Sequence, residues 1–305
     1  MLAAIFELET VAGDEVIDCA GDEYLAGRCE RRIRASIETA IPAIFPSLTS
    51  HSPAWSPLPV ECDTGGPMPH AAINGLEMYY EAHGNGPPLL LLHGGAGSIP
   101  EKWIPYFTPS FRVIAPEQMG HGRTADVADR PFHYHDMAED SVALMSHLGV
   151  ESAVVVGYSD GGILGLDMAI HHPERVTRLA ITGANARFNG YTNENQEWVR
   201  GLDPASEPVP EGYAQLSPDG AEHWPVVLGR LKAMWGAEPS FTTEELQRIE
   251  ARTLLVIGDR DIVTPEHAVE IFRTIPRAQL CVVPNVGHGT MPKETVLTFL
   301  QEAAT

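Results

Sequence analysis

The sequence is poor in basic side chains. Its 305 residues include 20 Lys+Arg against 41 Asp+Glu, which gives a formal net charge of −21 at pH 7. A nucleic-acid-binding chain needs a basic patch that attracts phosphates. The densest basic stretch, residues 28–34, is interrupted by Glu30 and flanked by acidic residues, as is typical of a solvated helix face. We therefore expect no nucleic-acid partner.

Cysteine is also scarce. The four cysteines are too few and too scattered for a disulfide framework or a structural zinc site. They are Cys19, Cys29, Cys62 and Cys281. A disulfide between Cys19 and Cys29 is compatible with the sequence, but the low cysteine content favours a reducing, cytoplasmic compartment.

Long apolar runs are missing as well. The longest, residues 89–92 and 153–156, fall far below the roughly 18 residues of a spanning helix. The first ten residues have no basic residue and carry Glu7 and Glu9, unlike a secretory signal. The sequence predicts no membrane span.

The first 66 residues differ from the rest of the chain. They hold 11 acidic residues against four basic ones and run into a Pro/Ser/Gly-rich stretch, residues 46–69. Apolar residues at helical spacing predict a helix over residues 22–41. We interpret residues 1–66 as an N-terminal extension that is dispensable for the main domain, residues 67–305. The alternative is that this helix docks on the domain or mediates dimerisation, and the oligomeric state stays open.

After Met68 the pattern becomes regular. Asn74-Gly75 lies between two short apolar segments, residues 71–73 and 77–82, which predicts a β-hairpin. Short apolar runs then alternate with helical patterns, which predicts an α/β fold with a mostly parallel sheet and helices on both faces. The predicted strands are residues 89–92, 113–115, 153–156, 179–182, 254–257 and 280–283. The predicted helices are residues 135–148, 161–171, 265–275 and 293–303.

One interval breaks this alternation. Residues 183–252 contain six prolines and three tryptophans between two predicted strands. The interval is too long for a crossover connection and too aromatic for a disordered linker. We interpret it as a small helical lid inserted into the domain.

A G-x-S-x-G motif follows the strand at residues 153–156. Gly157 and Gly161 permit a tight strand-to-helix turn that would expose the hydroxyl of Ser159. The alternative is a glycine-rich turn whose serine only caps the helix. A nucleophilic serine also needs an imidazole and usually a carboxylate, so its partners decide between the two interpretations.

Both partners follow later strands. Asp259 and Asp261 come directly after residues 254–257, and His288 comes after residues 280–283. The carboxyl ends of parallel strands meet at one edge of a sheet, where active sites gather. The alternative for His288 is an ordinary loop histidine, because the chain has 13 histidines.

The order Ser, Asp, His on this pattern resembles the alpha/beta-hydrolase fold family over residues 70–303. The resemblance implies that Ser159 is the nucleophile, His288 the general base and then acid, and Asp261 the orienting carboxylate. The family's spacing of glycine, acid and proline fits Gly258, Asp261 and Pro265. Asp259 is the competing candidate for this role, and we interpret it as an acid that caps the loop.

A glycine-rich loop supplies a second family-like feature. His93-Gly94-Gly95-Ala96-Gly97 follows a predicted strand, and the resemblance implies that the backbone N–H groups of Gly95 and Asp160 form the oxyanion hole. A dinucleotide site is the alternative, but the third glycine of that fingerprint is missing. The segment from His133 to Asp136 could bind a metal, but an exposed loop before a helix, with Asp136 in its first turn, explains it more simply. We expect no cofactor and no metal.

The resemblance implies a serine hydrolase that acts through an acyl-enzyme. A serine at position 159 disfavours epoxide hydrolases and haloalkane dehalogenases, which need a carboxylate there. Aromatic residues of the lid, with Trp198, Trp224 and Trp235 as the pocket candidates, favour small to medium apolar carboxylic esters. The alternatives are a carbon–carbon bond hydrolase of the meta-cleavage-product type, a lactonase, and a hydrolase-like ligand receptor.

Overall fold

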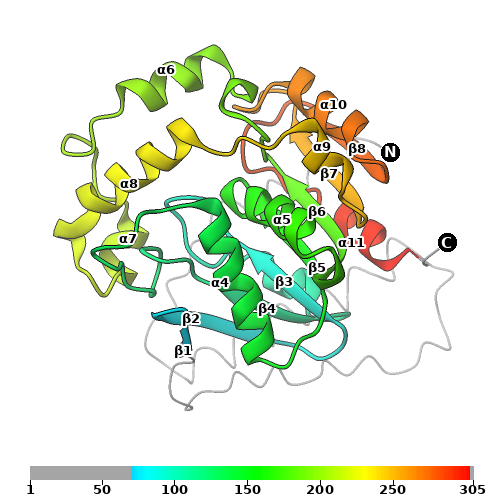
Figure 1. The fold of residues 1–305 in the computed structure, drawn as a ribbon, viewed down its shortest axis with the longest axis horizontal. Coiled ribbons are helices and arrows are strands. Elements are labelled where there is room, and N and C mark those ends of the chain that lie inside the picture. Colours follow the sequence, from blue (N-terminus) through cyan, green and yellow to red (C-terminus); the bar gives the residue numbers. More distant parts are fainter. Residues whose placement is uncertain (1–69, 303–305) are drawn as a thin grey trace, which may run out of the picture. The chain divides into compact units, whose positions relative to one another are not determined.

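The computed structural model describes residues 70–302, and the strands within this range form one sheet (Figure 1). The sheet order is β1-β2-β4-β3-β5-β6-β7-β8. β1 pairs with β2 and β2 with β4 in antiparallel fashion, and all other pairs are parallel, as predicted. The strands are β1 (His70–Ile73), β2 (Leu76–His83), β3 (Pro88–Leu92), β4 (Arg112–Pro116), β5 (Ala153–Tyr158), β6 (Val176–Thr182), β7 (Arg252–Gly258) and β8 (Ala278–Val283).

The predicted hairpin is confirmed at its turn. Asn74 and Gly75 have φ values of 48° and 87°. Both turn positions of a two-residue hairpin favour positive φ, which asparagine and glycine tolerate best. The turn sets the register in which Ile73 faces Leu76 and Ala71 faces Met78.

Alternate residues of the strands enter two separate apolar cores. Leu90 and Leu92 of β3 join the core beneath α4 (Tyr134–His147) and α5 (Asp160–His171). Leu89 and Leu91 face the opposite way, into the core covered by α3 (Ile104–Phe107) and α11 (Lys293–Gln301). Because successive side chains of a strand point to opposite faces, this sheet is buried on both sides, which explains its continuous apolar runs.

The insertion between β6 and β7 is helical. It holds α6 (Asn193–Gly201), α7 (Glu211–Leu216), α8 (Trp224–Ala237) and α9 (Thr243–Gln247), with short 3₁₀ turns at Phe188–Gly190 and Ala221–His223. Helices α6 and α8 pack against each other and form a layer apart from the sheet (Figure 1). The rest of the chain adds a 3₁₀ turn at Pro173–Arg175 and helix α10 (Pro265–Thr274). Sequence analysis did not predict α3, whose four residues are too few for a periodic pattern.

Part of the sequence analysis lies outside the described residues. This applies to the predicted helix at residues 22–41, to the boundary of the extension and to Cys19, Cys29 and Cys62. Within residues 70–302, no helix is both long enough and apolar enough to cross a bilayer.

Candidate active site

Ser159 lies at a sharp turn between β5 and α5. Its φ and ψ are 53° and −119°, a backbone conformation that a residue with a side chain seldom adopts. The turn needs the two glycines of the motif, because a Cβ on Gly157 would lie 2.2 Å from the carbonyl oxygen of Gly161. A Cβ on Gly161 would lie 2.3 Å from the carbonyl oxygen of Leu92. Packing of backbone against backbone therefore holds the serine in this strained position.

The sheet brings the three predicted polar residues together. The Nε2 atom of His288 lies 2.9 Å from Oγ of Ser159, and its Nδ1 atom lies 2.7 Å from Oδ1 of Asp261. The three residues follow β8, β5 and β7, whose carboxyl ends share one edge of the sheet. With Nδ1–H donating to the carboxylate, Nε2 is left to accept the serine proton.

The two candidate acids have different environments. Asp261 is buried, and its Oδ1 atom also accepts a hydrogen bond from the Val263 amide at 3.2 Å. Asp259 is exposed, and its carboxylate accepts from the Val286 amide at 3.3 Å. The carboxylate that contacts His288 is therefore that of Asp261, while Asp259 caps the neighbouring loop.

The backbone of Gly95 packs directly on Asp160. A Cβ at position 95 would lie 2.2 Å from Oδ2 of Asp160. Helix α5 begins at Asp160, and the first N–H groups of a helix have no acceptor within the helix. The first hydrogen bond of this turn is donated by the Gly162 amide to the Ser159 carbonyl. In the described part of the chain, neither the Gly95 nor the Asp160 N–H donates to a backbone acceptor. The backbone hydrogen bonds of this turn therefore leave both donors uncommitted.

His93 fixes the loop that carries Gly95. Its Nδ1–H donates to the carbonyl oxygen of Gly94 at 2.8 Å, and its Nε2 atom accepts from the Gln118 amide at 3.0 Å. Burial lowers the pKa of His93 to about 4, although the bond to Gly94 opposes this shift. The ring is therefore neutral near pH 7, which allows one nitrogen to donate and the other to accept.

The carboxylate of Asp160 has a role that sequence analysis missed. It accepts hydrogen bonds from the Tyr134 hydroxyl and from the indole N–H of Trp235, both at 2.9 Å. Burial raises the pKa of this carboxyl, against the opposing effect of the two hydrogen bonds. In the sequence, Asp160 is recognisable only as the residue that directly follows the predicted nucleophile. That position predicts a role for its backbone N–H and none for its side chain.

The three tryptophans of the insertion lie in different environments. Trp235 contacts Asp160 as described, and its ring centre lies 6.0 Å from that of Trp198, which is 48% exposed. Trp224 is 3% exposed and packs against Tyr213, with 5.0 Å between ring centres. Among the three, Trp235 is the one whose side chain reaches the residue after Ser159.

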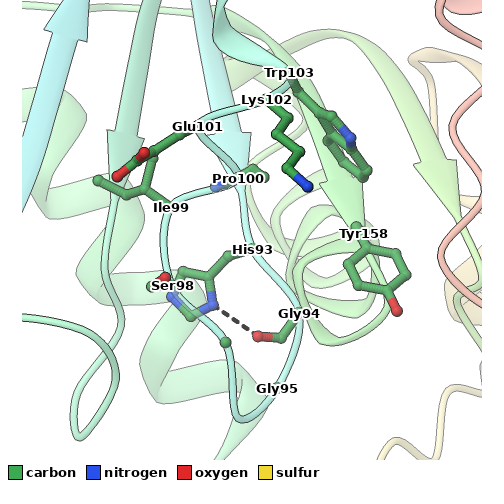
Figure 2. A pocket seen from close by; sticks show the side chains of 11 residues that line it. His93, Gly94, Gly95, Ser98, Ile99, Pro100, Glu101, Lys102, Trp103 and Tyr158 are labelled. Carbon is green, nitrogen blue, oxygen red and sulfur yellow. Dashed lines mark hydrogen bonds between the residues drawn. The ribbon is translucent and has the colours of Figure 1, made fainter. Parts of the chain in front are cut away.

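A cavity of about 460 Å³ opens beside the loop that carries Gly95 (Figure 2). Its walls include Trp103 and Tyr158, whose rings meet edge to face at 5.8 Å, together with Ile99 and Lys102. The ring centre of Tyr158 also lies 5.1 Å from that of His288. None of the three tryptophans of the insertion is among the described residues that line this cavity. Sequence analysis missed Trp103, because its loop has no recognisable motif.

Comparisons with known proteins agree with the fold. The sequence profile of the alpha/beta hydrolase fold matches residues 87–217. A non-heme haloperoxidase from Rhodococcus erythropolis is 30% identical over 75% of this chain and 98% of its own length. A protein named "Putative carbamate hydrolase RutD" from Azorhizobium caulinodans is 35% identical over 73% of this chain and 92% of its own length. The crystal structure of an enol-lactonase from Burkholderia xenovorans has a TM-score of 0.61 and 23% identity, and covers 77% of this chain and 100% of its own, which speaks to the fold alone.

Proposed function

The chain belongs to the alpha/beta hydrolase family, and on that premise we propose that it is a serine hydrolase that cleaves small to medium apolar carboxylic esters. The observation that carries the proposal is the position of His288. One ring nitrogen lies 2.9 Å from Oγ of Ser159 and the other 2.7 Å from the carboxylate of Asp261. Each contact has the length of a hydrogen bond, so a proton can leave the serine while the imidazole keeps its orientation.

In the acylation step, Nε2 of His288 takes the proton from Oγ of Ser159, and Oγ attacks the carbonyl carbon of the ester. The carbonyl oxygen becomes an oxyanion, which the N–H groups of Gly95 and Asp160 would hold. A donor of this kind typically supplies about 3–4 kcal/mol of transition-state stabilisation. The carbon–oxygen bond to the alcohol then breaks, and the leaving oxygen takes the proton from His288.

In the deacylation step, water replaces the alcohol. His288 removes a proton from the water, whose oxygen attacks the acyl carbon bound to Oγ of Ser159. Collapse of the second oxyanion releases the carboxylic acid and returns the proton to the serine. The cycle needs no group beyond the protein and water.

The cavity supports an apolar substrate. Its volume of about 460 Å³ falls within the usual range of small-molecule sites, and Trp103, Tyr158 and Ile99 give it an apolar surface beside the charged side chains of Glu101 and Lys102. The net charge of −21 also disfavours strongly anionic substrates. We propose that this cavity receives one side of the ester while the carbonyl group lies at Ser159.

Other carbonyl substrates would share the first attack. A carbamate, a lactone or a vinylogous diketone each presents a carbonyl carbon to the same serine, and each leaves a different group. The family also allows a receptor that keeps these residues and turns over slowly. Repeated turnover distinguishes the enzyme from the receptor, and the relative kcat/KM values distinguish the substrates.

The test is a substrate panel assayed with the wild-type chain and with Ser159→Ala. The panel contains p-nitrophenyl esters from acetate to decanoate, an aryl carbamate, a lactone and a vinylogous diketone. We expect many turnovers per chain, the highest kcat/KM on short or medium esters, and a loss of several orders of magnitude in Ser159→Ala. Faster cleavage of the carbamate, lactone or diketone would assign the other bond type, and equal rates in Ser159→Ala would reject the serine mechanism.

A further inference from the structure

A second group of polar side chains lies between α4 and α5. His135 belongs to the first turn of α4, and Asp167 and His171 lie four residues apart on one face of α5. Asp167 is eight residues beyond Ser159, or about 12 Å along the helix. The triad and the oxyanion donors use none of these three side chains.

The three side chains converge on one carboxylate oxygen. Oδ1 of Asp167 lies 3.0 Å from Nδ1 of His135 and 3.2 Å from Nδ1 of His171, and the latter nitrogen also lies 3.1 Å from the backbone carbonyl oxygen of Asp167. One candidate ligand atom from each residue lies within 4.8 Å of the other two. Ligand atoms at about 2.0–2.1 Å from a tetrahedral zinc ion lie about 3.3 Å from one another. Two of the three separations are already close to this value, and the third is no longer than 4.8 Å.

We propose that His135, Asp167 and His171 form a binding site for a divalent transition-metal ion of the zinc class. Two imidazole nitrogens and one carboxylate oxygen suit Zn²⁺ or Co²⁺, whereas Mg²⁺ and Ca²⁺ prefer oxygen ligands alone. The fourth position faces solvent, because the side chains of His135 and His171 are 52% and 37% exposed. Asp167 is 3% exposed, so the helices hold the carboxylate in a fixed position.

A further carboxylate lies behind the first histidine. An oxygen of Glu139, one turn along α4, lies 3.9 Å from Nε2 of His135 and 2.6 Å from Nε2 of His172. A histidine that binds metal through one nitrogen usually donates the N–H of the other to such a group, which fixes the ring. Glu139 is too far from His135 for a direct hydrogen bond and is bonded to His172 instead, so its contribution to a bound cation would be its negative charge, added to that of Asp167.

This site differs from the local segment that sequence analysis considered. His133 is only two residues from His135, yet its Nδ1 atom lies 2.6 Å from the carboxylate of Glu238 in the insertion. The grouping therefore depends on the packing of two helices rather than on adjacent residues. A bound ion would link the first turn of α4 to the last turn of α5, the helix that begins at the nucleophile turn, and would stabilise the folded chain by mass action.

The test is a calorimetric titration of the full chain with Zn²⁺, and with Mg²⁺ for comparison. The variants are His135→Gln, His171→Gln, the double variant, and His147→Gln as a control on an exposed histidine of the same helix. We expect each single substitution in the site to weaken Zn²⁺ binding at least about 10-fold, as lost outer-shell partners already do in metal sites. His147→Gln should bind as the wild type does, and Mg²⁺ should not bind.

Two further readouts do not depend on catalysis. Co²⁺ should give the visible absorption of a tetrahedral complex with the wild type and lose it in the double variant. Zn²⁺ should raise the thermal midpoint of the wild type and leave that of the double variant unchanged. Without metal, the variants should melt close to the wild type. No Zn²⁺ binding by the wild type, or equal affinity in the double variant, would overturn the proposal.

Discussion

The indole N–H of Trp235 donates to Oδ2 of Asp160 at 2.9 Å, so a residue of the insertion contacts the residue that follows Ser159. Tyr134 supplies the other donor to the same buried carboxylate. The amide of Asp160 is a proposed oxyanion donor, so the contacts of its side chain would help to position that donor. The position of α8 and the reactivity of the serine should therefore be coupled.

Trp235→Phe tests this coupling, because it keeps an aromatic ring and removes the donor. Losing a partner of a buried polar group costs about 1–3 kcal/mol, so we expect a lower free energy of unfolding. We also expect a lower kcat on a short ester with little change in KM, measured by steady-state kinetics. Trp198→Phe, in an exposed ring that contacts Trp235, is the matched control. Identical behaviour of the two variants would contradict the coupling.

Asp261→Asn and Asp259→Asn separate the two candidate acids. An amide side chain at position 261 would favour the wrong imidazole tautomer of His288, and we expect kcat to fall by about 10⁴-fold. The same change at position 259 would only weaken a loop contact, so the rate of Asp259→Asn should stay near that of the wild type. The measurement is kcat on one ester at a fixed pH, and the reverse order of the two losses would move the acid to Asp259.

Buried histidines should make the fold sensitive to acid. Burial lowers the pKa of His93 to about 4, and burial together with the charge of the neighbouring His93 lowers that of His121 to about 3. In the unfolded chain the pKa of an imidazole is about 6.5. As the pH falls below that value, the unfolded chain binds protons that the folded chain excludes. Each histidine therefore removes about 1.4 kcal/mol of stability per pH unit, down to its folded pKa.

His121→Gln isolates one of these two contributions. Between about pH 6 and pH 4.5, the slope of the unfolding free energy against pH should fall by about 1.4 kcal/mol per pH unit relative to the wild type. Urea unfolding at several pH values measures this slope, and the exposed His147→Gln serves as control. Acidic groups with raised pKa values, such as Asp160 and Asp140, act in the opposite direction but equally in all these variants. An unchanged slope in His121→Gln would contradict the account.

The sequence predicted the features that depend on local pattern. The Asn74-Gly75 hairpin, the alternating strands and helices, and the turn at Ser159 each follow from neighbouring residues, and the edge rule for parallel sheets joined Ser159 to His288. Contacts between distant side chains left no such signal. Trp224 and Trp235 look alike in the sequence, because packing inside an insertion and contacting a site both favour large aromatic residues. The meeting of His135 with Asp167 and His171 depends on how two helices are offset, which no spacing in the chain reveals.

The N-terminal boundary is tested by a chain that begins at Met68. All the proposed catalytic residues lie beyond this point, so we expect the shorter chain to keep the thermal midpoint and the kcat/KM of the full chain on one short ester. The comparison requires both chains purified under identical conditions. An insoluble product, or a much lower midpoint, would show that residues 1–66 contribute to the core.

Covalent labelling tests the central claim most directly. A fluorophosphonate reacts with an activated serine and leaves a stable phosphonyl ester that intact-mass spectrometry detects. We predict a single adduct, located by peptide mapping on Ser159, which is absent in Ser159→Ala and forms far more slowly in His288→Ala. An adduct on another residue, or equal labelling of Ser159→Ala, would contradict the assignment of Ser159 as the nucleophile.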